Sequence, residues 1–172
     1  MAAAQRQVDL ARLSLSSGQA RTVELELPLE RVDLGGQQYR PQDGVPARLD
    51  VSRTTSGFAL RLRFSGELAG PCMRCLEPAT LRIDVDVREV DQAGTGDEEL
   101  TSPYVSDGTL DVERWGNDAF VLALPTKVLC RSDCAGLCPV CGESLNEADP
   151  EDHRHSQGGD PRMAKLRELK LD

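Results

Sequence analysis

Four stretches of alternating apolar and polar residues constrain the fold of this chain more than any other feature. They cover residues 23–29, 47–53, 58–64 and 81–87, and the clearest is 58–64, where Phe or Leu occupies every second position. Alternation with a period of two is typical of strands that bury one face. Because turns separate the stretches, the sequence predicts an antiparallel β meander.

One long helix is expected after these strands. Asp111 is a suitable N-cap, apolar residues from Trp115 to Ala123 recur at helical spacing, and Pro125 would end the helix near residue 124. We interpret the apolar stripe of this helix as part of the core rather than as a platform for a ligand.

The amino-terminal residues, Met1 to Gln7, contain no apolar stretch of the length used for secretion. No other segment is apolar enough to predict a membrane span. We therefore expect a cytoplasmic protein. In that reducing compartment, paired cysteines hold metal more often than they hold each other.

The net charge is −9, and most of the excess lies between residues 84 and 114, which hold ten acidic side chains and two arginines. Residues 91–109 are rich in Gly, Asp, Glu, Ser and Thr, so a long acidic loop is expected there. This charge disfavours a general phosphate-binding surface. The loop is either solvated surface or a contact for a basic partner such as a ribosomal protein.

Two CxxC pairs predict metal binding. Cys72 and Cys75 lie between two expected strands, and Cys138 and Cys141 lie in a segment that contains Pro and Gly. A CxxC turn brings two thiolates to one tetrahedral ion, and its backbone N–H groups donate to the sulfurs. One pair is a weak signal, but two pairs with two further cysteines nearby favour structural zinc.

The six cysteines and two histidines suffice for two tetrahedral sites. We expect the first site to join distant parts of the chain, and the second to close a local loop with the spacing C-x2-C-x11-H-x-H. The first ligand set is Cys72, Cys75, Cys130 and Cys134, and the second is Cys138, Cys141, His153 and His155.

Other assignments of these residues stay open at this point. A competing partition places one ion on Cys130, Cys134, Cys138 and Cys141. His153 and His155 could be ordinary surface histidines. The first CxxC pair could instead be a redox pair of the thioredoxin type, although no βαβ pattern surrounds it.

The chain is not expected to be an enzyme. A catalytic zinc keeps an open position beside a general base, whereas four protein ligands close each expected site. The sequence contains no Gly-rich phosphate loop, no G-x-S-x-G motif and no metalloprotease helix. A metal-dependent hydrolase or thiol oxidoreductase is the alternative that these observations disfavour.

Together, these expectations describe an α+β fold: an antiparallel β meander with a long helix and a zinc-stapled C-terminal segment. Residues 1–129 would form a β-rich domain with the acidic loop (about 91–109) and the helix (about 111–124). Residues 130–172 would form a cysteine-rich zinc-binding segment that ends in a short helix, because Asp160-Pro161 suits a helix start.

Two blocks of the sequence resemble the signatures of the YceD family, whose domain was formerly called DUF177. The first block is PCMRCLEP at residues 71–78, and the second is residues 124–142, which contain the other four cysteines. Leu145-Asn146 and residues 160–162 also fit the family pattern. The resemblance extends over about residues 20–170.

The carboxy-terminal part departs from that pattern at one place. Family members with the full block usually carry a CxC motif between the LN and DPR motifs, where this chain has His153 and His155. An exchange of Cys for His retains a metal ligand, so the departure fits a Cys2His2 site.

The family is described as large-subunit ribosomal RNA accumulation proteins. The resemblance therefore implies a non-enzymatic ribosome-biogenesis factor that supports 23S rRNA accumulation or large-subunit assembly. The expected partner is a large-subunit ribosomal protein or the pre-ribosome, with rRNA as another candidate; neither a membrane nor a small-molecule substrate is expected. A direct RNA-binding zinc protein is the alternative, against which the net charge counts.

Overall fold

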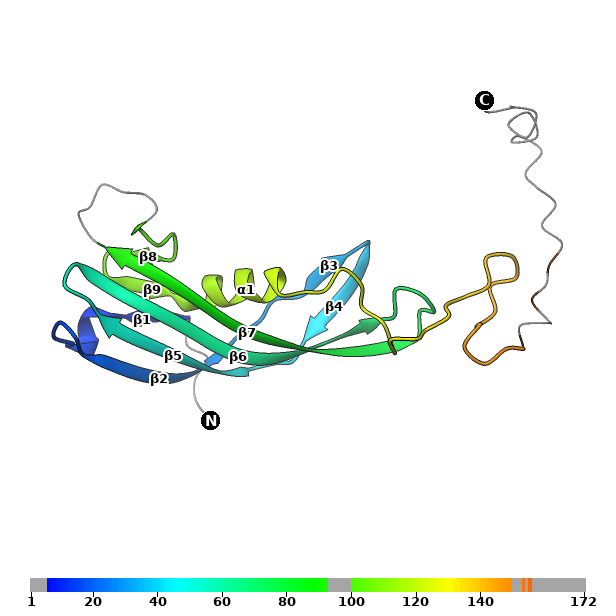
Figure 1. Ribbon diagram of the computed structural model, residues 1–172, viewed down its shortest axis with the longest axis horizontal. Helices are drawn as coiled ribbons and strands as arrows, with labels where there is room; N and C mark the ends of the chain where they lie inside the picture. Colours follow the sequence, from blue (N-terminus) through cyan, green and yellow to red (C-terminus); the bar gives the residue numbers. More distant parts are fainter. Residues whose placement is uncertain (1–5, 93–99, 150–152, 154, 156–172) are drawn as a thin grey trace, which may run out of the picture.

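A long antiparallel hairpin forms the centre of the structure, a computed structural model that describes residues 6–92 and 100–149 together with His153 and His155. The hairpin consists of β6 (Gly57–Pro71) and β7 (Pro78–Gln92), which pair along their whole length. Figure 1 shows it running the length of a curved sheet, with its connecting loop at one end.

The rest of the main sheet is built on the other edge of β6. β5 (Val45–Arg53) pairs with the first half of β6, and β4 (Gln37–Pro41) pairs with the second half. β2 (Ala20–Leu27) extends the sheet beyond β5, and β3 (Val32–Leu34) extends it beyond β4. The predicted antiparallel β fold is confirmed, and β3 and β4 are additions to it.

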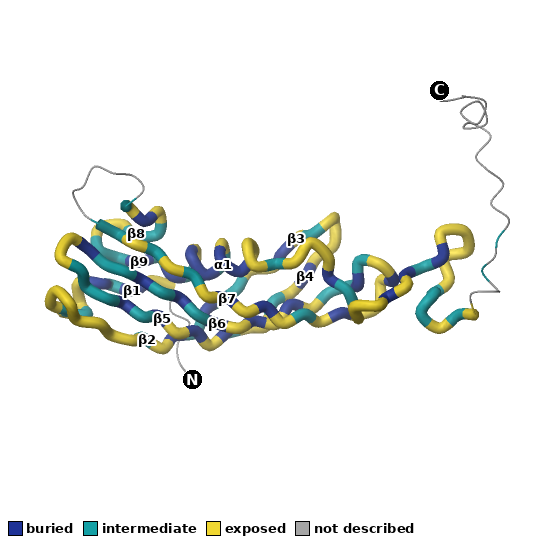
Figure 2. The backbone as a smooth tube through the Cα atoms, in the orientation of Figure 1, coloured by how far each residue is buried: buried dark blue, intermediate teal, exposed yellow. Residues whose placement is uncertain are grey.

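Buried and exposed residues alternate along the strands of this sheet (Figure 2), so the apolar side chains of the alternating stretches share one face. Leu49 and Leu62 are fully buried there. The helix α1 (Val112–Leu122) covers the same face, and the ring of Phe120 stacks on that of Phe64 with 6.4 Å between centroids. Trp115, Ala119 and Phe120 of the predicted apolar stripe are therefore core, whereas Ala123 is exposed.

The helix is short rather than long, which corrects one prediction. It contains 11 residues and begins after Asp111, whose carboxylate accepts a 3.0 Å hydrogen bond from the backbone N–H of Arg114, as the N-cap prediction requires. It cannot extend backwards because β9 (Thr109–Asp111) precedes it. It cannot extend far forwards because Pro125 disfavours a helical backbone at Leu124.

Part of the predicted acidic loop, residues 91–109, is regular structure. β8 (Val105–Ser106) and β9 form a tight hairpin around Asp107 and Gly108, whose φ values are 50° and 73°. Two central residues with positive φ are typical of a type I′ turn. β9 also pairs with β1 (Gln7–Asp9), so a second, three-stranded sheet forms.

Several acids between residues 84 and 114 have partners within the molecule. Arg61 pairs with Asp86 through two hydrogen bonds, one of them 2.7 Å from Nε to Oδ1, and the hydroxyl of Ser65 donates to Asp84. Part of the excess negative charge is therefore offset on the exposed face of the sheet. The acids Asp97, Glu98 and Glu99 lie outside the described residues.

The described residues contain no helix with the length and apolar character needed to cross a membrane. A short 3₁₀ helix, η1 (Ala11–Leu13), follows β1. The terminal helix expected after Asp160 lies outside the described residues.

Candidate metal centres

The loop between β6 and β7 folds back on itself around the first CxxC pair. The backbone N–H of Cys72 donates to the carbonyl oxygen of Glu77 (2.7 Å), and the N–H of Leu76 donates to that of Cys72 (3.0 Å). Leu76 has a left-handed backbone, with φ of 66°, which reverses the chain directly after Cys75. The N–H of Arg74 lies 3.4 Å from the sulfur of Cys72.

The second CxxC pair is held in the same backbone arrangement. The N–H of Cys138 donates to the carbonyl oxygen of Glu143 (2.8 Å), and the N–H of Gly142 donates to that of Cys138 (2.9 Å). Gly142 has φ of 77° and takes the position that Leu76 takes in the first loop. The chain therefore contains two copies of one turn.

Four cysteine sulfurs meet at the end of the β6–β7 hairpin; we call this group cluster 1. The sulfurs of Cys72 and Cys134 are 3.8 Å apart, those of Cys75 and Cys130 are 3.5 Å apart, and all four lie within 4.8 Å of one another. A tetrahedral ion with metal–sulfur bonds of about 2.3 Å separates its sulfur ligands by about 3.8 Å. The geometry of cluster 1 therefore fits one metal ion.

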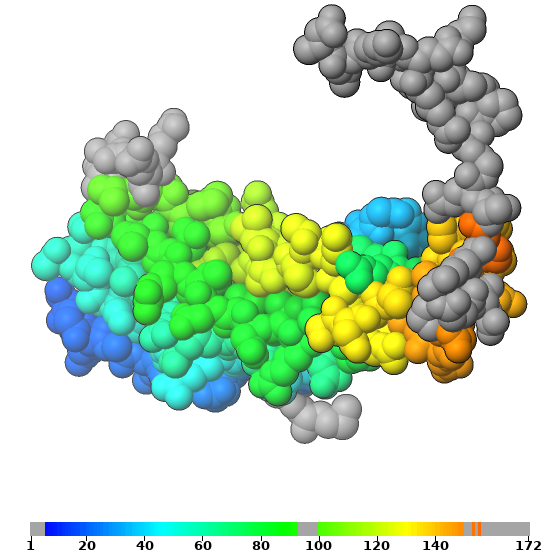
Figure 3. All heavy atoms as spheres, turned by 45° about the vertical axis from the view of Figure 1, so that its right-hand side comes forward, coloured from blue at the N-terminus to red at the C-terminus, as the bar shows by residue number. Residues whose placement is uncertain are grey.

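The segment that follows α1 returns to the hairpin end (Figure 3). Cluster 1 lies where the two meet. The N–H of Met73 donates to the carbonyl oxygen of Val128 (2.9 Å), and Nη1 of Arg74 donates to that of Cys134 (2.6 Å). Val128, Cys72 and Cys134 are fully buried. Hydrogen bonds, burial and the four converging sulfurs thus join two segments that are far apart in the sequence.

The electrostatics of cluster 1 suit a bound cation. Burial raises the pKa of Cys72, but backbone N–H groups directed at its sulfur lower it to about 6. At Cys130, loss of hydration and then the neighbouring sulfurs of the cluster raise the pKa to about 12. Four thiolates cannot coexist at neutral pH without a compensating positive charge, which a divalent metal ion supplies.

Two cysteines and two histidines form a second group, cluster 2: Cys138, Cys141, His153 and His155. Nδ1 of His153 lies 3.5 Å from the sulfur of Cys141. Around a tetrahedral zinc, sulfur and nitrogen ligands are about 3.6 Å apart. Backbone N–H groups of Cys141 and Val140 lower the pKa of Cys138 to about 6, against the effect of burial, so this sulfur is suited to act as a thiolate ligand.

Both histidines of cluster 2 have the surroundings of metal ligands. Nε2 of His155 is buried and has no hydrogen-bond partner among the described residues. Such an atom is costly unless it binds something. Nε2 of His153 lies 3.7 Å from the carboxylate of Glu143, so its other ring nitrogen, Nδ1, is the one turned towards the sulfurs. A carboxylate behind a histidine ligand is a recurrent feature of metal sites.

The structure groups the cysteines and histidines as the preferred partition predicts. The competing set does not form one group, because Cys130 and Cys134 lie with the hairpin cysteines. The redox alternative requires a strand that leads into a helix, whereas the first CxxC pair joins two antiparallel strands. Either cluster could hold a metal ion. Which metal each would bind is proposed below from the types of its side chains.

Sequence reasoning did not identify the residues around the clusters. Asn146 was noted only as part of a family motif, yet its side chain contacts Cys134. The hydroxyl of Tyr39 lies against the hairpin end. The LN motif was the one available signal for Asn146, and nothing in the local pattern indicated Tyr39.

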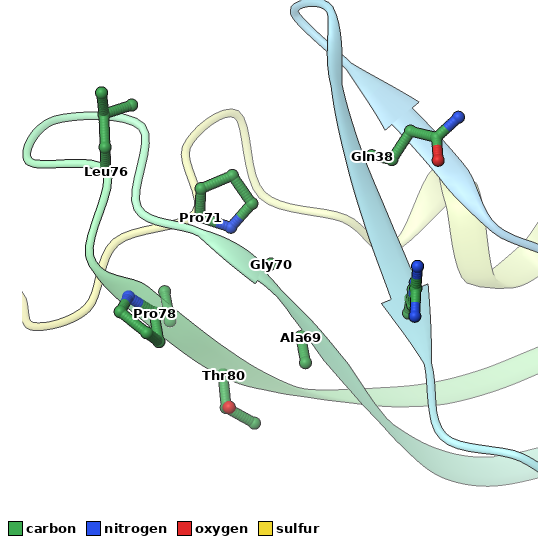
Figure 4. A pocket seen from close by; sticks show the side chains of 9 residues that line it. Gln38, Ala69, Gly70, Pro71, Leu76, Pro78 and Thr80 are labelled. Atoms are coloured by element: carbon green, nitrogen blue, oxygen red, sulfur yellow. The ribbon is translucent and has the colours of Figure 1, made fainter.

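A hollow of about 420 Å³ lies beside cluster 1, where β4 diverges from β6 (Figure 4). Leu76 stands on one side of it and Gln38 on the other. Leu76 is 60% exposed, and its left-handed backbone is unusual for a leucine. The lining consists of Gln38, Arg40, Ala69, Gly70, Pro71, Leu76, Pro78, Ala79 and Thr80.

In the residues that the structure describes, these features define an antiparallel β protein with one short α-helix and two cysteine-containing clusters that could hold metal ions. Residues 60–170 match the family model described as "Large ribosomal RNA subunit accumulation protein YceD". The chain belongs to the YceD family. The matched residues include every member of both clusters.

Curated relatives come from mycobacteria. An uncharacterised protein of Mycobacterium tuberculosis (strain ATCC 25618 / H37Rv) is 38% identical over 126 residues, which cover 70% of this chain and 59% of that protein. One from Mycobacterium leprae (strain TN) is 32% identical over 133 residues, covering 73% and 60%. The chain thus spans about three fifths of the length of the curated relatives it matches. No solved structure matches it.

Proposed function

We propose that this protein is a non-enzymatic factor that supports large-subunit rRNA accumulation or large-subunit assembly, and that each cluster binds one structural zinc ion. Membership of the YceD family supports the first part. The single observation that carries the second part is the convergence of four sulfurs, from two distant segments, within 4.8 Å of one another.

Zinc is the metal that these ligand sets favour. Four-sulfur and two-sulfur, two-nitrogen sets with tetrahedral spacing are typical of structural zinc sites, in which the ion supplies folding energy rather than reactivity. Each set already offers four protein ligands, so neither cluster leaves a position for a substrate or a reactive water. Cys72, Cys75, Cys130 and Cys134 would hold one ion, and Cys138, Cys141, His153 and His155 the other.

The zinc ions would fix a surface for a protein partner at the hairpin end. Cluster 1 and the Met73–Val128 hydrogen bond hold two segments together beside the hollow that Leu76 borders. A large-subunit ribosomal protein suits this chain better than rRNA does, because basic proteins complement a net charge of −9. The low aromatic content, 3%, also disfavours stacking on RNA bases.

Metal analysis tests the zinc assignment. The purified full chain should contain two zinc ions, and the His153→Ala/His155→Ala and Cys72→Ser/Cys75→Ser variants should each contain one. One zinc in both the unaltered chain and the histidine variant would remove cluster 2 from the proposal. No zinc in the unaltered chain would overturn the assignment of both clusters.

Complementation tests the biological role. Cells that lack the gene should accumulate less 23S rRNA relative to 16S rRNA, and the unaltered gene should restore the ratio. The Cys72→Ser/Cys75→Ser variant should restore it poorly at matched protein levels. A normal 23S ratio in the deletion strain would contradict the role. Capture of large-subunit particles on tagged protein, with and without nuclease, would then separate a protein partner from an RNA partner.

A further inference from the structure

Asn146 links the loop of cluster 2 to a sulfur of cluster 1. Its Nδ2 lies 3.6 Å from the sulfur of Cys134. Its Oδ1 accepts hydrogen bonds from the backbone N–H of Ala135 (2.8 Å) and from Nη2 of Arg131 (3.0 Å). In the sequence, Asn146 lies between the cysteines and the histidines of cluster 2.

The orientation of this side-chain amide follows from its partners. Both Ala135 N–H and the Arg131 guanidinium are donors, so they face the amide oxygen rather than its NH2 group. The NH2 group is thereby directed at the sulfur of Cys134. It gives Cys134 the kind of N–H contact that the backbone N–H of Arg74 gives Cys72.

The loop that carries Asn146 is tied to the segment between the clusters. Only three residues separate Cys134 of cluster 1 from Cys138 of cluster 2. The N–H of Leu145 donates to the carbonyl oxygen of Gly136 (2.8 Å), and Leu137 forms an antiparallel bridge with Ser144. The position of Asn146 therefore depends on the order of the loop that cluster 2 closes.

We propose that Asn146 is a positioning residue through which metal binding at cluster 2 strengthens metal binding at cluster 1. This inference rests on the proposal that both clusters bind zinc. Four thiolates around one divalent ion leave excess negative charge on sulfur, and N–H donors stabilise that charge. An ion at cluster 2 orders the loop beforehand, so less conformational entropy is lost when Asn146 contacts Cys134.

The coupling is reciprocal by thermodynamic linkage. If metal at cluster 2 raises the affinity of cluster 1, then metal at cluster 1 raises the affinity of cluster 2 by the same factor. The effect passes through Asn146, so its removal should make the two clusters bind metal independently.

Cobalt titration of the metal-free full chain tests this inference, since cobalt bound by four sulfurs and cobalt bound by two sulfurs and two nitrogens absorb differently. Asn146→Ala should weaken cluster 1 by roughly tenfold or more, the range typical of residues that support metal ligands. Asn146→Asp should do the same, because it keeps the oxygen but lacks the NH2 donor. Glu147→Ala, at the exposed neighbouring residue, is the matched control and should bind as the unaltered chain does.

Two results would overturn the inference while leaving the zinc proposal intact. One is an Asn146→Asp variant that binds cobalt at cluster 1 as tightly as the unaltered chain, which would show that the N–H contact does not contribute. The other is a His153→Ala/His155→Ala variant with an unchanged affinity at cluster 1, which would show that the clusters are independent. Failure of the unaltered chain to bind metal would instead contradict the proposed function itself.

Discussion

The hydroxyl of Tyr39, on β4, donates a 2.8 Å hydrogen bond to the carbonyl oxygen of Pro71, the last residue of β6. Tyr39 is fully buried, and burial together with the nearby Cys72 raises its pKa, so the hydroxyl keeps its proton and remains a donor. This bond holds β4 to the end of β6, one residue before Cys72 of cluster 1.

Tyr39→Phe should lower the free energy of unfolding by about 1 kcal/mol, because it leaves the Pro71 carbonyl without this donor. Urea denaturation followed by circular dichroism measures the change. Tyr104→Phe is a matched control, since its hydroxyl bonds to Asp118 at an exposed position, and it should change stability by less than about 0.5 kcal/mol. Equal effects of the two substitutions would contradict the role given to Tyr39.

Gly70→Ala should be more damaging than the loss of that hydroxyl. A Cβ atom at Gly70 would lie 2.2 Å from the ring of Tyr39, so the ring or the strand must move. The expected cost is about 2–3 kcal/mol, at the upper end for overpacking. Gly66→Ala gives a graded comparison: its Cβ would lie 3.1 Å from Phe120, so a smaller cost is expected in the same denaturation assay. The reverse order would contradict the packing described here.

Most of the main sheet and the two CxxC turns could be predicted from the sequence because both depend on local periodicity or spacing. The strand at residues 81–87 buries alternate side chains, and a CxxC turn is nearly complete within a few residues. β8 and β9 were missed, although Asp107-Gly108 is a strong local signal for a type I′ hairpin. The acidic composition around that pair favours a loop, and this signal conflicts with that of the turn.

Long-range pairings could not be predicted in the same way. β1 pairs with β9 across about a hundred residues, and Tyr39 meets Pro71 across 32. Such contacts depend on the packing of the whole sheet, and no local sequence pattern predicts them. The contact between Asn146 and Cys134 is separated by only 12 residues, but it depends on how the second loop folds back.

Asp50 predicts a pH-dependent contribution to stability. The hydroxyl of Thr22 is the largest cause that lowers its pKa to about 2, partial burial acts in the opposite direction, and the nearby arginines lower it further. A carboxyl group whose pKa is lower in the folded state stabilises the fold above its unfolded pKa, here 3.8, and loses that effect as the pH falls towards 2.

Asp50→Asn should therefore cost about 1–2 kcal/mol at neutral pH, and the difference from the unaltered chain should shrink between about pH 4 and pH 2. Denaturation of both proteins across this range measures the difference directly. Asp43→Asn, at an exposed residue, should show no comparable trend. A difference that stays constant down to pH 2 would mean that the charge of Asp50 is not what stabilises the fold.

Leu76→Gly should leave the fold as stable as before or slightly more stable. The left-handed backbone at Leu76 costs about 1–2 kcal/mol for a residue with a Cβ atom, and the greater freedom of glycine in the unfolded chain offsets about half of that. The side chain is 60% exposed, so little burial is lost. Gly142→Leu, the reverse change in the equivalent turn, should destabilise cluster 2 and lower its zinc content. A loss above about 1 kcal/mol for Leu76→Gly would show that the leucine packs against the hollow.

Removal of metal should affect the two ends of the molecule unequally. Leu27, Leu49 and Leu62 are fully buried in the apolar core, and none of them belongs to a cluster. The sheet should therefore persist after chelation. The segment of residues 124–149 depends on the two clusters and a few hydrogen bonds, so it should lose its protection against hydrogen exchange.

Hydrogen exchange with mass spectrometry, with and without a strong zinc chelator, measures this difference. Peptides from β5 and the first half of β6 should exchange slowly in both states, and peptides from residues 124–149 should exchange quickly only after chelation. The Cys72→Ser/Cys75→Ser variant, which keeps the ligand set of cluster 2, should resemble the chelated protein over residues 124–134 before any chelator is added. If chelation also abolished protection in β5, metal would be supporting the whole fold, because the apolar core would then be too small to hold the sheet by itself.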